Sequence, residues 1–269
     1  MQDVLAHALG WATTVAVAAV DPHGPVATAG DASAELDWAS VTKLVTTLAV
    51  LRAVDAGDID LDEPAGPPGA TVRHLLAHAS GLGFEGDAPV SGPERTRIYS
   101  NPGFDLLGAL LAERAGTSFQ RVATNAVLAP LGMRSTRVVG RPSAGIAGPL
   151  GDLVLLAKEL MRPTLLTPET LRRARTVAFP GLAGVLPGVA RYDQLDWGLG
   201  FEIRDGKAPH WTGTRNSPET FGHFGGSGAF LWVDPVADVA LAALSDRRFG
   251  PWALEAWPTL SDAVLAQRP

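Results

Sequence analysis

The sequence contains no cysteine, and lysine, methionine and tyrosine are scarce, with three, three and two copies among 269 residues. The lack of cysteine excludes disulfide bonds, thiolate nucleophiles and cysteine-ligated metals. The formal charge of −6 gives no basic surface of the kind that binds nucleic acid. Apolar runs are broken by glycine, proline or charge before they reach the length of about 18 residues that a membrane helix needs. We expect neither nucleic acid nor membrane as a partner, and no metal or other cofactor.

The remaining composition is that of an ordinary folded protein. Hydrophobic residues make up 46% of the chain and charged residues 19%, and the length suffices to bury a full core. The amino-terminal segment, residues 1–20, is apolar but lacks the basic start and the small-residue cleavage site of a secretory signal. We therefore expect a cytoplasmic protein that folds as one compact body.

The hydrophobic pattern changes along the chain from strand to helix and back to strand. Apolar stretches over about 13–20 and 25–29 flank a turn and predict a hairpin. Helical spacing follows over about 40–56, 71–79, 103–115, 118–127, 149–161 and 167–175. The strand period returns over 200–204, 228–233 and 237–244, before a closing helix over about 251–266. The span 176–195 is rich in glycine and proline, and its pattern is uninformative about secondary structure.

Strands at both ends with helices between them predict an α+β fold, in which one antiparallel sheet is built from both ends of the chain and flanked by helices. We predict a discontinuous sheet lobe formed by residues 1–57 and 196–269. Residues 58–195 would form a mostly helical lobe, and the active site would lie between the two lobes.

Three short motifs each occur once: Ser40-Val41-Thr42-Lys43, Tyr99-Ser100-Asn101 and His223-Phe224-Gly225. A serine hydroxyl is a weak nucleophile until a base takes its proton. Lys43 lies one helical turn after Ser40 on the same face, and burial would lower the pKa of its amine far enough for it to serve as that base. Tyr99 can relay protons, and the amide of Asn101 can hydrogen-bond both a lysine and a substrate carbonyl.

His223 opens a glycine-rich strand, whose glycines allow a substrate to lie close to the backbone. After Gly225, the N–H of Gly226 could pair with the N–H of Ser40 as an oxyanion hole. Each motif alone has a simpler explanation. Ser-x-x-Lys is usually a helix cap with a solvated lysine, and the other two motifs are ordinary turns. Their joint occurrence in suitable contexts favours a serine acyl-transfer site.

With these motifs in place, nearly the whole chain resembles the serine β-lactamase and penicillin-binding-protein superfamily, on the branch of class C β-lactamases, D-alanyl-D-alanine carboxypeptidases and family VIII carboxylesterases. The resemblance extends to Leu75-Leu76-Ala77-His78-Ala79-Ser80-Gly81-Leu82, to the segment 99–110 and to Pro130-Leu131-Gly132-Met133. Asp152-Leu153 matches a later helix of the family. The implied fold is that of β-lactamases and transpeptidases.

The resemblance implies that Ser40 is the acylated nucleophile and that Lys43 and Tyr99 form its base system. Asn101 would orient the substrate, and His223 stands where relatives have the lysine of Lys-Thr-Gly. Phe224 replaces the threonine whose hydroxyl helps to hold a substrate carboxylate. We therefore expect a small-molecule ester or amide substrate, most of all small carboxylic esters. The alternatives are a β-lactamase or D,D-carboxypeptidase/D-aminopeptidase-like amidase, and a penicilloyl-binding sensor that turns over slowly or has lost activity.

Two other patterns are weaker. Residues 81–86 fit the string G-x-G-x-x-G but follow a helical segment, whereas a dinucleotide site needs a strand before the glycines and a helix after them. His74 and His78 lie one helical turn apart, as two metal ligands do. No third ligand is evident, so we predict that these histidines cap or pack.

Overall fold

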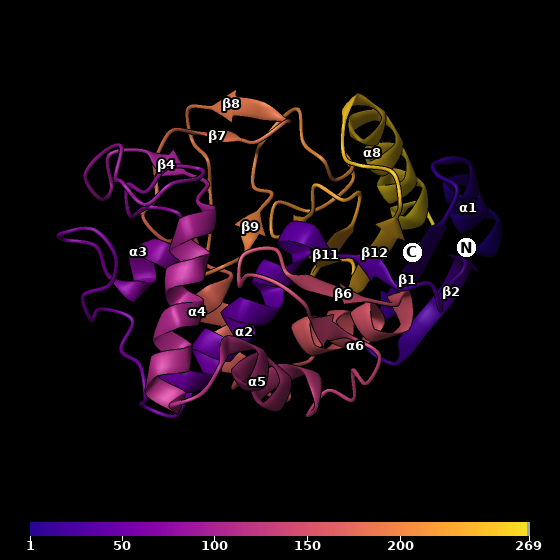
Figure 1. Ribbon diagram of the computed structural model, residues 1–269. Coiled ribbons are helices and arrows are strands. Elements are labelled where there is room, and N and C mark those ends of the chain that lie inside the picture. The colour runs from indigo at the N-terminus through magenta and orange to yellow at the C-terminus, as the bar shows by residue number, and fades with distance from the viewer. Residues whose placement is uncertain (268–269) are drawn as a thin grey trace.

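A computed structural model describes residues 1–267, and its central feature is an antiparallel sheet of six strands (Figure 1). The strand order is β2-β1-β12-β11-β10-β9. These strands come from the two ends of the chain: β1 (Val15–Asp21), β2 (Gly24–Gly30), β9 (Glu202–Ile203), β10 (Phe221–Phe224), β11 (Phe230–Asp234) and β12 (Val239–Ser245). The predicted α+β fold, with one antiparallel sheet from both chain ends, is confirmed.

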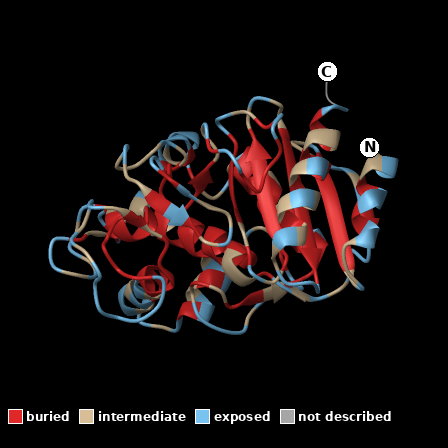
Figure 2. Cartoon of the chain, turned by 90° about the horizontal axis from the view of Figure 1, so that it is seen from above, coloured by how far each residue is buried: buried red, intermediate tan, exposed pale blue. Residues whose placement is uncertain are grey.

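Strand β1 is apolar on both faces because helices cover both sides of the sheet. In Figure 2 most strands of the sheet are coloured as buried. Successive side chains of a strand point to opposite faces. Ala16, Ala18 and Val20 share a buried cluster with the helices α2 (Thr42–Asp55) and α6 (Leu150–Met161). The intervening residues of β1 share the other cluster with α8 (Pro251–Leu265). Burial on both faces accounts for the long apolar runs at the chain ends.

The remaining helices follow the predicted spans. They are α3 (Val72–Leu76), α4 (Asn101–Ala115), α5 (Phe119–Ala123) and α7 (Pro168–Ala174). Helix α4 begins two residues earlier than predicted, and the other three are shorter than predicted. The predicted helix over 118–127 continues from α5 into a turn of π-helix, η3 (Thr124–Leu128). The hydrophobic pattern did not predict α1 (Gln2–Ala6) or the 3₁₀ helix η1 (His7–Gly10), which pack against α8.

The predicted division into two lobes remains a prediction. Helix α6 lies inside the span 58–195, yet it packs against β1, β11 and β12 of the large sheet. A three-stranded sheet formed by β3 (Leu36–Asp37), β6 (Ile146–Gly148) and β5 (Arg137–Val138) also joins the amino-terminal span to the helical one. The two predicted lobes therefore contact each other through α6 and through the β3-β6-β5 sheet.

The span 176–195, about which the sequence pattern is uninformative, contains two short strands. Strand β7 (Gly184–Leu186) pairs in parallel with β4 (Arg97–Ile98) and antiparallel with β8 (Ala190–Tyr192). At Gly184 a side chain would meet the carbonyl oxygen of Arg97 at 2.3 Å, so glycine permits the close approach of β4 and β7. The pairing depends on residues about 90 positions apart, which a local pattern does not reveal. It places β7 beside the segment that carries Tyr99.

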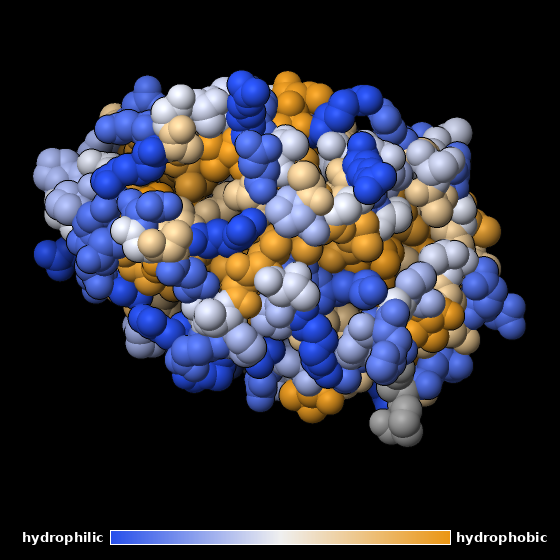
Figure 3. All heavy atoms as spheres, turned by 90° about the horizontal axis from the view of Figure 1, so that it is seen from below, coloured by the Kyte–Doolittle hydropathy of each residue, from blue (hydrophilic) through white to orange (hydrophobic). Residues whose placement is uncertain are grey.

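The face of the molecule seen in Figure 3 carries both hydrophilic and apolar side chains. Blue, hydrophilic side chains cover much of the face in Figure 3, and smaller orange, apolar areas lie between them. Within residues 1–267, no helix has both the length and the apolar character needed to cross a membrane.

Candidate active site

Ser40 lies on a tight turn at the edge of the core. It belongs to the 3₁₀ helix η2 (Ala39–Val41), and the α-helix α2 begins only at Thr42. Ala39 adopts a φ of 42°, in the left-handed region, and its N–H donates to Asp37 Oδ1 at 2.7 Å. A buried tryptophan, Trp38, anchors the turn through a hydrogen bond from its indole N–H to the carbonyl of Gly148 at 3.1 Å. Ser40 itself is partly exposed and lines a cavity of about 270 Å³.

Lys43 is completely buried beneath Ser40, with three oxygen atoms around its amine. The Nζ atom lies 3.1 Å from Ser40 Oγ, 2.7 Å from Asn101 Oδ1 and 2.8 Å from the carbonyl oxygen of Ser143. Burial lowers the pKa of Lys43 well below its ordinary value, because the charged form loses its hydration. The neutral amine is therefore accessible at far lower pH than for a lysine in solvent.

The two fixed acceptors also orient that amine. A neutral amine has two N–H groups and one lone pair. The oxygens of Asn101 and Ser143 can only accept hydrogen bonds from it. Once both N–H groups donate to these oxygens, the lone pair is left for the third neighbour, Ser40 Oγ. The arrangement can thus take the serine proton, which is the task of a general base.

Tyr99 and His223 form a second hydrogen-bonded pair beside Ser40. The His223 ring lies with Nδ1 at 2.6 Å from the carbonyl oxygen of Phe224, so Nδ1 carries the proton. Its Nε2 is then an acceptor for the Tyr99 hydroxyl at 3.4 Å. Burial raises the pKa of Tyr99, with the Ser40 hydroxyl acting in the opposite direction. Tyr99 is therefore a neutral phenol that can pass a proton on, and His223 orients it.

Asn101 is positioned by the start of helix α4. Ser100 caps this helix by accepting a hydrogen bond from the N–H of Gly103 at 3.1 Å, and Pro102 occupies the first turn. Asn101 is therefore the first helical residue, and its backbone N–H donates to the carbonyl of Phe84 at 3.1 Å. The local sequence Ser-Asn-Pro fixes where the amide side chain points.

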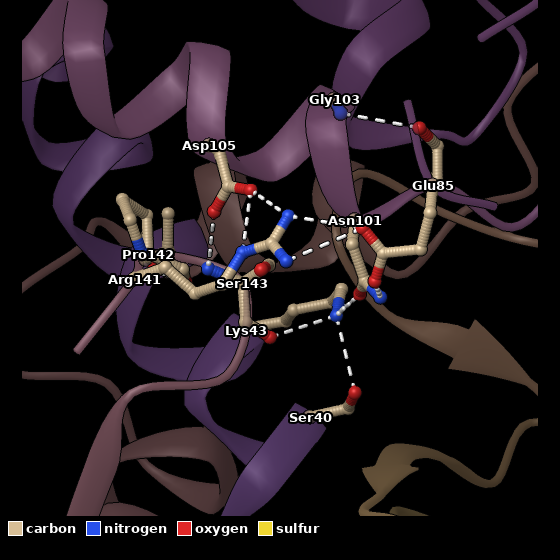
Figure 4. A network of polar contacts seen from close by, with 11 residues as sticks. Ser40, Lys43, Glu85, Asn101, Gly103, Asp105, Arg141, Pro142 and Ser143 are labelled. Carbon is tan, nitrogen blue, oxygen red and sulfur yellow. Dashed lines mark hydrogen bonds and ion pairs between the residues drawn. The ribbon is translucent and has the colours of Figure 1, made fainter. Parts of the chain in front are cut away.

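A closed ring of hydrogen bonds and ion pairs surrounds the Lys43 amine (Figure 4). Asn101 donates from Nδ2 to Glu85 at 2.7 Å, and Glu85 pairs with the Arg141 guanidinium at 3.2 Å. Arg141 donates from Nε to Asp105 at 2.8 Å. Asp105 in turn accepts from the N–H of Ser143 at 3.1 Å, and the carbonyl of Ser143 accepts from Lys43. The other members of the ring thereby fix the position of Asn101 and Ser143, whose oxygens accept hydrogen bonds from the Lys43 amine.

The glycines after His223 bring a second backbone segment to Ser40. A side chain at Gly225 would lie 2.4 Å from the Trp38 carbonyl oxygen and 3.3 Å from the Ser40 nitrogen, so only glycine permits this approach. The N–H of Gly225 donates to the carbonyl of Ala229 at 2.8 Å and is not free to bind an oxyanion. Among the described residues, no acceptor takes the N–H of Gly226, which borders the cavity. The N–H of Gly226 is thus available to an acceptor in the cavity, whereas Gly225 contributes space.

The cavity at Ser40 has apolar walls. Besides Ser40, Tyr99 and His223, it is bordered by Phe84, Leu186, Pro187, Gly188, Phe224, Gly226 and Phe249. The ring of Phe224 packs against Phe249, with ring centroids 4.7 Å apart. Within residues 1–267, this lining contains no carboxylate, ammonium or guanidinium group. Phe224 does line the cleft, as its place in the third motif suggested.

The pKa of His223 is lowered to about 3, first by burial and then by the nearby Lys43. Burial also lowers the pKa of His78 well below its ordinary value. Both rings are thus neutral in the folded protein at pH values where they bind a proton in the unfolded chain. Since the unfolded state then binds more protons, stability falls as the pH drops from about 6.5 towards 3.

We expect this loss to be measurable between pH 7 and pH 5, above the range in which carboxylates titrate. His223→Gln should reduce the slope of the unfolding free energy by up to about 1.4 kcal/mol per pH unit. Urea denaturation at a series of pH values provides the measurement, and His23→Gln, on an exposed turn, is the matched control. Identical slopes for the wild type and His223→Gln would contradict the prediction.

All seven site residues predicted from the sequence meet at this cleft: Ser40, Lys43, Tyr99, Asn101, His223, Gly225 and Gly226. The sequence did not indicate Glu85, Asp105, Arg141 or the carbonyl of Ser143, because they lie in loops or on a helix surface without a distinctive spacing. The histidine pair proposed to cap or pack does so. His74 completes a capping box with Thr71, and His78 accepts from the N–H of Ser100 at 3.0 Å.

Comparison with known proteins agrees with the geometry of the site. The family model described as Beta-lactamase matches residues 11–265. A crystal structure described as a beta-lactamase from Mycobacterium bovis is 48% identical, with a TM-score of 0.95, and the match covers 97% of this chain and 98% of that one. EstCE1, described as a hydrolase with promiscuous acyltransferase activity, has a TM-score of 0.80 over 98% of this chain and 97% of its own. At 18% identity that likeness is one of fold.

Curated proteins match over a shorter span. Esterase EstB from Burkholderia gladioli is 28% identical over 160 residues, which are 42% of this chain and 41% of EstB. The D-alanyl-D-alanine-carboxypeptidase/endopeptidase AmpH from Escherichia coli K12 is 28% identical over 141 residues, 39% of this chain and 37% of AmpH. The chain therefore matches about two fifths of the length of these curated relatives.

Proposed function

The chain belongs to the Beta-lactamase family, and from this premise we propose that it is a serine hydrolase that forms an acyl-enzyme at Ser40 and acts on small, neutral carboxylic esters. The hydrolase class is common to the family. The choice of ester as substrate rests on the walls of the cavity.

In the first step, Ser40 Oγ attacks the ester carbonyl carbon while its proton moves to the Lys43 amine. The short contact from Nζ to Oγ and the lowered pKa of Lys43 support this role. The carbonyl oxygen becomes negatively charged and would be bound by the N–H groups of Ser40 and Gly226. The intermediate collapses when the bond to the leaving oxygen breaks.

The leaving oxygen needs a proton as it departs. Lys43 carries the proton taken from Ser40, and the neutral phenol of Tyr99 can pass a proton on because His223 holds its hydroxyl at 3.4 Å. In the second step, water loses a proton to the same base system and attacks the acyl carbon. Ser40 recovers its proton, and the carboxylic acid leaves.

One observation carries the choice of substrate: the described lining of the cavity contains no cationic side chain to pair with a carboxylate. Phe224 has no hydrogen-bond donor on its side chain, and His223 is neutral because its pKa is lowered to about 3. A β-lactam or a D-alanyl peptide presents a carboxylate close to the reacting carbonyl. Placing that charge without a partner in an apolar cavity is unfavourable, whereas a neutral ester incurs no such penalty.

A second candidate is hydrolysis of β-lactams or D-alanyl peptides. The description of the Mycobacterium bovis relative as a beta-lactamase favours it, as does the name of AmpH. Both reactions would use the same nucleophile and base, so only the relative rates for the two substrate classes separate the candidates.

We expect kcat/KM for p-nitrophenyl butyrate to exceed that for nitrocefin by at least about 100-fold, because a site without a partner for a substrate's polar group rejects it strongly. Phe224→Thr should narrow this ratio by supplying a hydroxyl, and Phe224→Leu, which keeps the wall apolar, should leave it wide. Both rates are measured by absorbance with the same protein stock. A larger kcat/KM for nitrocefin would contradict the ester proposal and favour the second candidate.

Stopped-flow mixing with p-nitrophenyl acetate tests turnover itself. A burst of one equivalent followed by steady release indicates an acyl-enzyme that water hydrolyses. A burst with no steady release would instead indicate a sensor that acylates and deacylates slowly.

A further inference from the structure

A second cavity, of about 340 Å³, lies directly beside the one at Ser40. Three residues border both cavities: Phe84, Tyr99 and Pro187. The rings of Phe84 and Tyr99 stack with centroids 5.9 Å apart and form the wall between them. We call the second cavity the side chamber. Its floor is the small sheet of β4 and β7, seen above α4 in Figure 1.

The side chamber is apolar even though arginine and threonine contribute to its lining. The guanidinium of Arg97 is turned away and donates to the carbonyl oxygens of Ala178 at 2.6 Å and Phe179 at 2.8 Å. The hydroxyl of Thr96 donates to the carbonyl of Ala183 at 2.7 Å. The surface left for a ligand consists mainly of Ile98, Val185 and the two shared rings, and the exposed residue Arg191 also borders the chamber.

Resting on the proposed ester hydrolysis, we propose that the side chamber binds the alcohol part of the substrate, as an apolar alkyl or aryl-alkyl group. The proton returns to the leaving oxygen through Lys43 and Tyr99, so that oxygen must lie near the Tyr99 hydroxyl. Atoms beyond it continue past the Tyr99 ring, which is the shared wall of the side chamber. The acyl part faces the opposite wall of the Ser40 cavity, formed by Phe224 and Phe249.

The proposal predicts a dependence on alcohol length that is separate from acyl length. Each methylene group that leaves water for an apolar cavity raises kcat/KM up to about fourfold. In the series phenyl, 4-propylphenyl and 4-pentylphenyl acetate, the acyl group is constant and the leaving groups differ little in acidity. We expect kcat/KM to rise by about tenfold or more from the first to the last member.

Val185→Trp should abolish this rise, because Val185 lines the side chamber and is half-exposed, so a larger side chain fits there without disturbing the core. Ile98→Phe is a second, independent way to fill the chamber. The matched control is Val236→Trp, at an exposed valine between β11 and β12. In the series 4-nitrophenyl acetate, butyrate and hexanoate only the acyl part varies, so the ratios of kcat/KM between its members should be unaffected by Val185→Trp.

The outcomes separate this inference from the proposed function. If the folded wild type hydrolyses neither series in a Ser40-dependent manner, the ester proposal is wrong. If it hydrolyses both but Val185→Trp and Ile98→Phe leave the alcohol series unchanged, the side chamber does not bind the alcohol. If Val185→Trp and Ile98→Phe instead abolish only the dependence of kcat/KM on acyl length, the side chamber binds the acyl part. That result would also overturn the inference.

Discussion

Ser40→Ala is expected to reduce ester turnover by at least about four orders of magnitude and to abolish labelling by a fluorophosphonate probe. The reason is that no covalent intermediate can form once the hydroxyl is removed. The fold should persist, because Ser40 is partly exposed and its one described side-chain hydrogen bond is to Lys43. Intact mass after probe treatment, with circular dichroism on the same sample, provides the measurement.

The matched control for this experiment is Ser227→Ala. Ser227 lies in the glycine-rich turn, next to Gly226, which borders the same cavity. Ser227 itself is not among the residues that border it. It should retain probe labelling and turnover near the wild-type level. Hydrolysis by Ser40→Ala at a rate comparable with the wild type would remove Ser40 from the role of nucleophile.

The second large effect concerns the base. Lys43→Met, which preserves most of the buried volume, should lower kcat/KM by about 100-fold or more, and so should Tyr99→Phe. Under the proposed mechanism, only the neutral amine of Lys43 can accept the Ser40 proton in the wild type. kcat/KM should therefore fall as the pH drops below the lowered pKa of Lys43, and this acidic limb should disappear in Lys43→Met.

Lys158→Met is the control for the base experiment, since Lys158 lies on helix α6, outside the cavity lining. Its rate and pH profile should match those of the wild type. An unchanged rate in Lys43→Met or in Tyr99→Phe would exclude that residue from the mechanism. An unchanged acidic limb in Lys43→Met would assign the limb to another group.

The sequence predicted the parts of the fold that follow from local pattern. Strands β1 and β12 and helices α2, α4 and α6 are long enough for apolar periodicity to indicate them. Strands β4, β7 and β8 have two or three residues each; β4 pairs with the distant β7, and β7 also pairs with the neighbouring β8. No hydrophobic period can develop over so few residues, so their prediction would require knowledge of the tertiary contacts.

The candidate site shows the same division. Ser40, Lys43, Tyr99 and Asn101 stand out because their spacing is fixed by a turn or a helix start. Glu85 and Arg141 are separated by 56 positions, and each is one of many charged residues in surface loops. Their pairing could not be predicted, although it determines how Asn101 is held. Phe249 reaches the cavity from the loop before α8, and its contribution to the site could not be predicted for a similar reason.

The closed ring around Lys43 also sets the charge balance of the reaction. With Lys43 as an amine, the carboxylates of Glu85 and Asp105 outweigh the single guanidinium of Arg141 by one negative charge. In the proposed acylation, the proton from Ser40 reaches Lys43 in a neighbourhood that is one positive charge short, and its arrival makes the ring electrically neutral. Both carboxylates raise the pKa of Lys43 against the dominant effect of burial. Because these counter-charges are already in place, the ammonium that appears on acylation and vanishes on deacylation requires no movement of the surrounding groups.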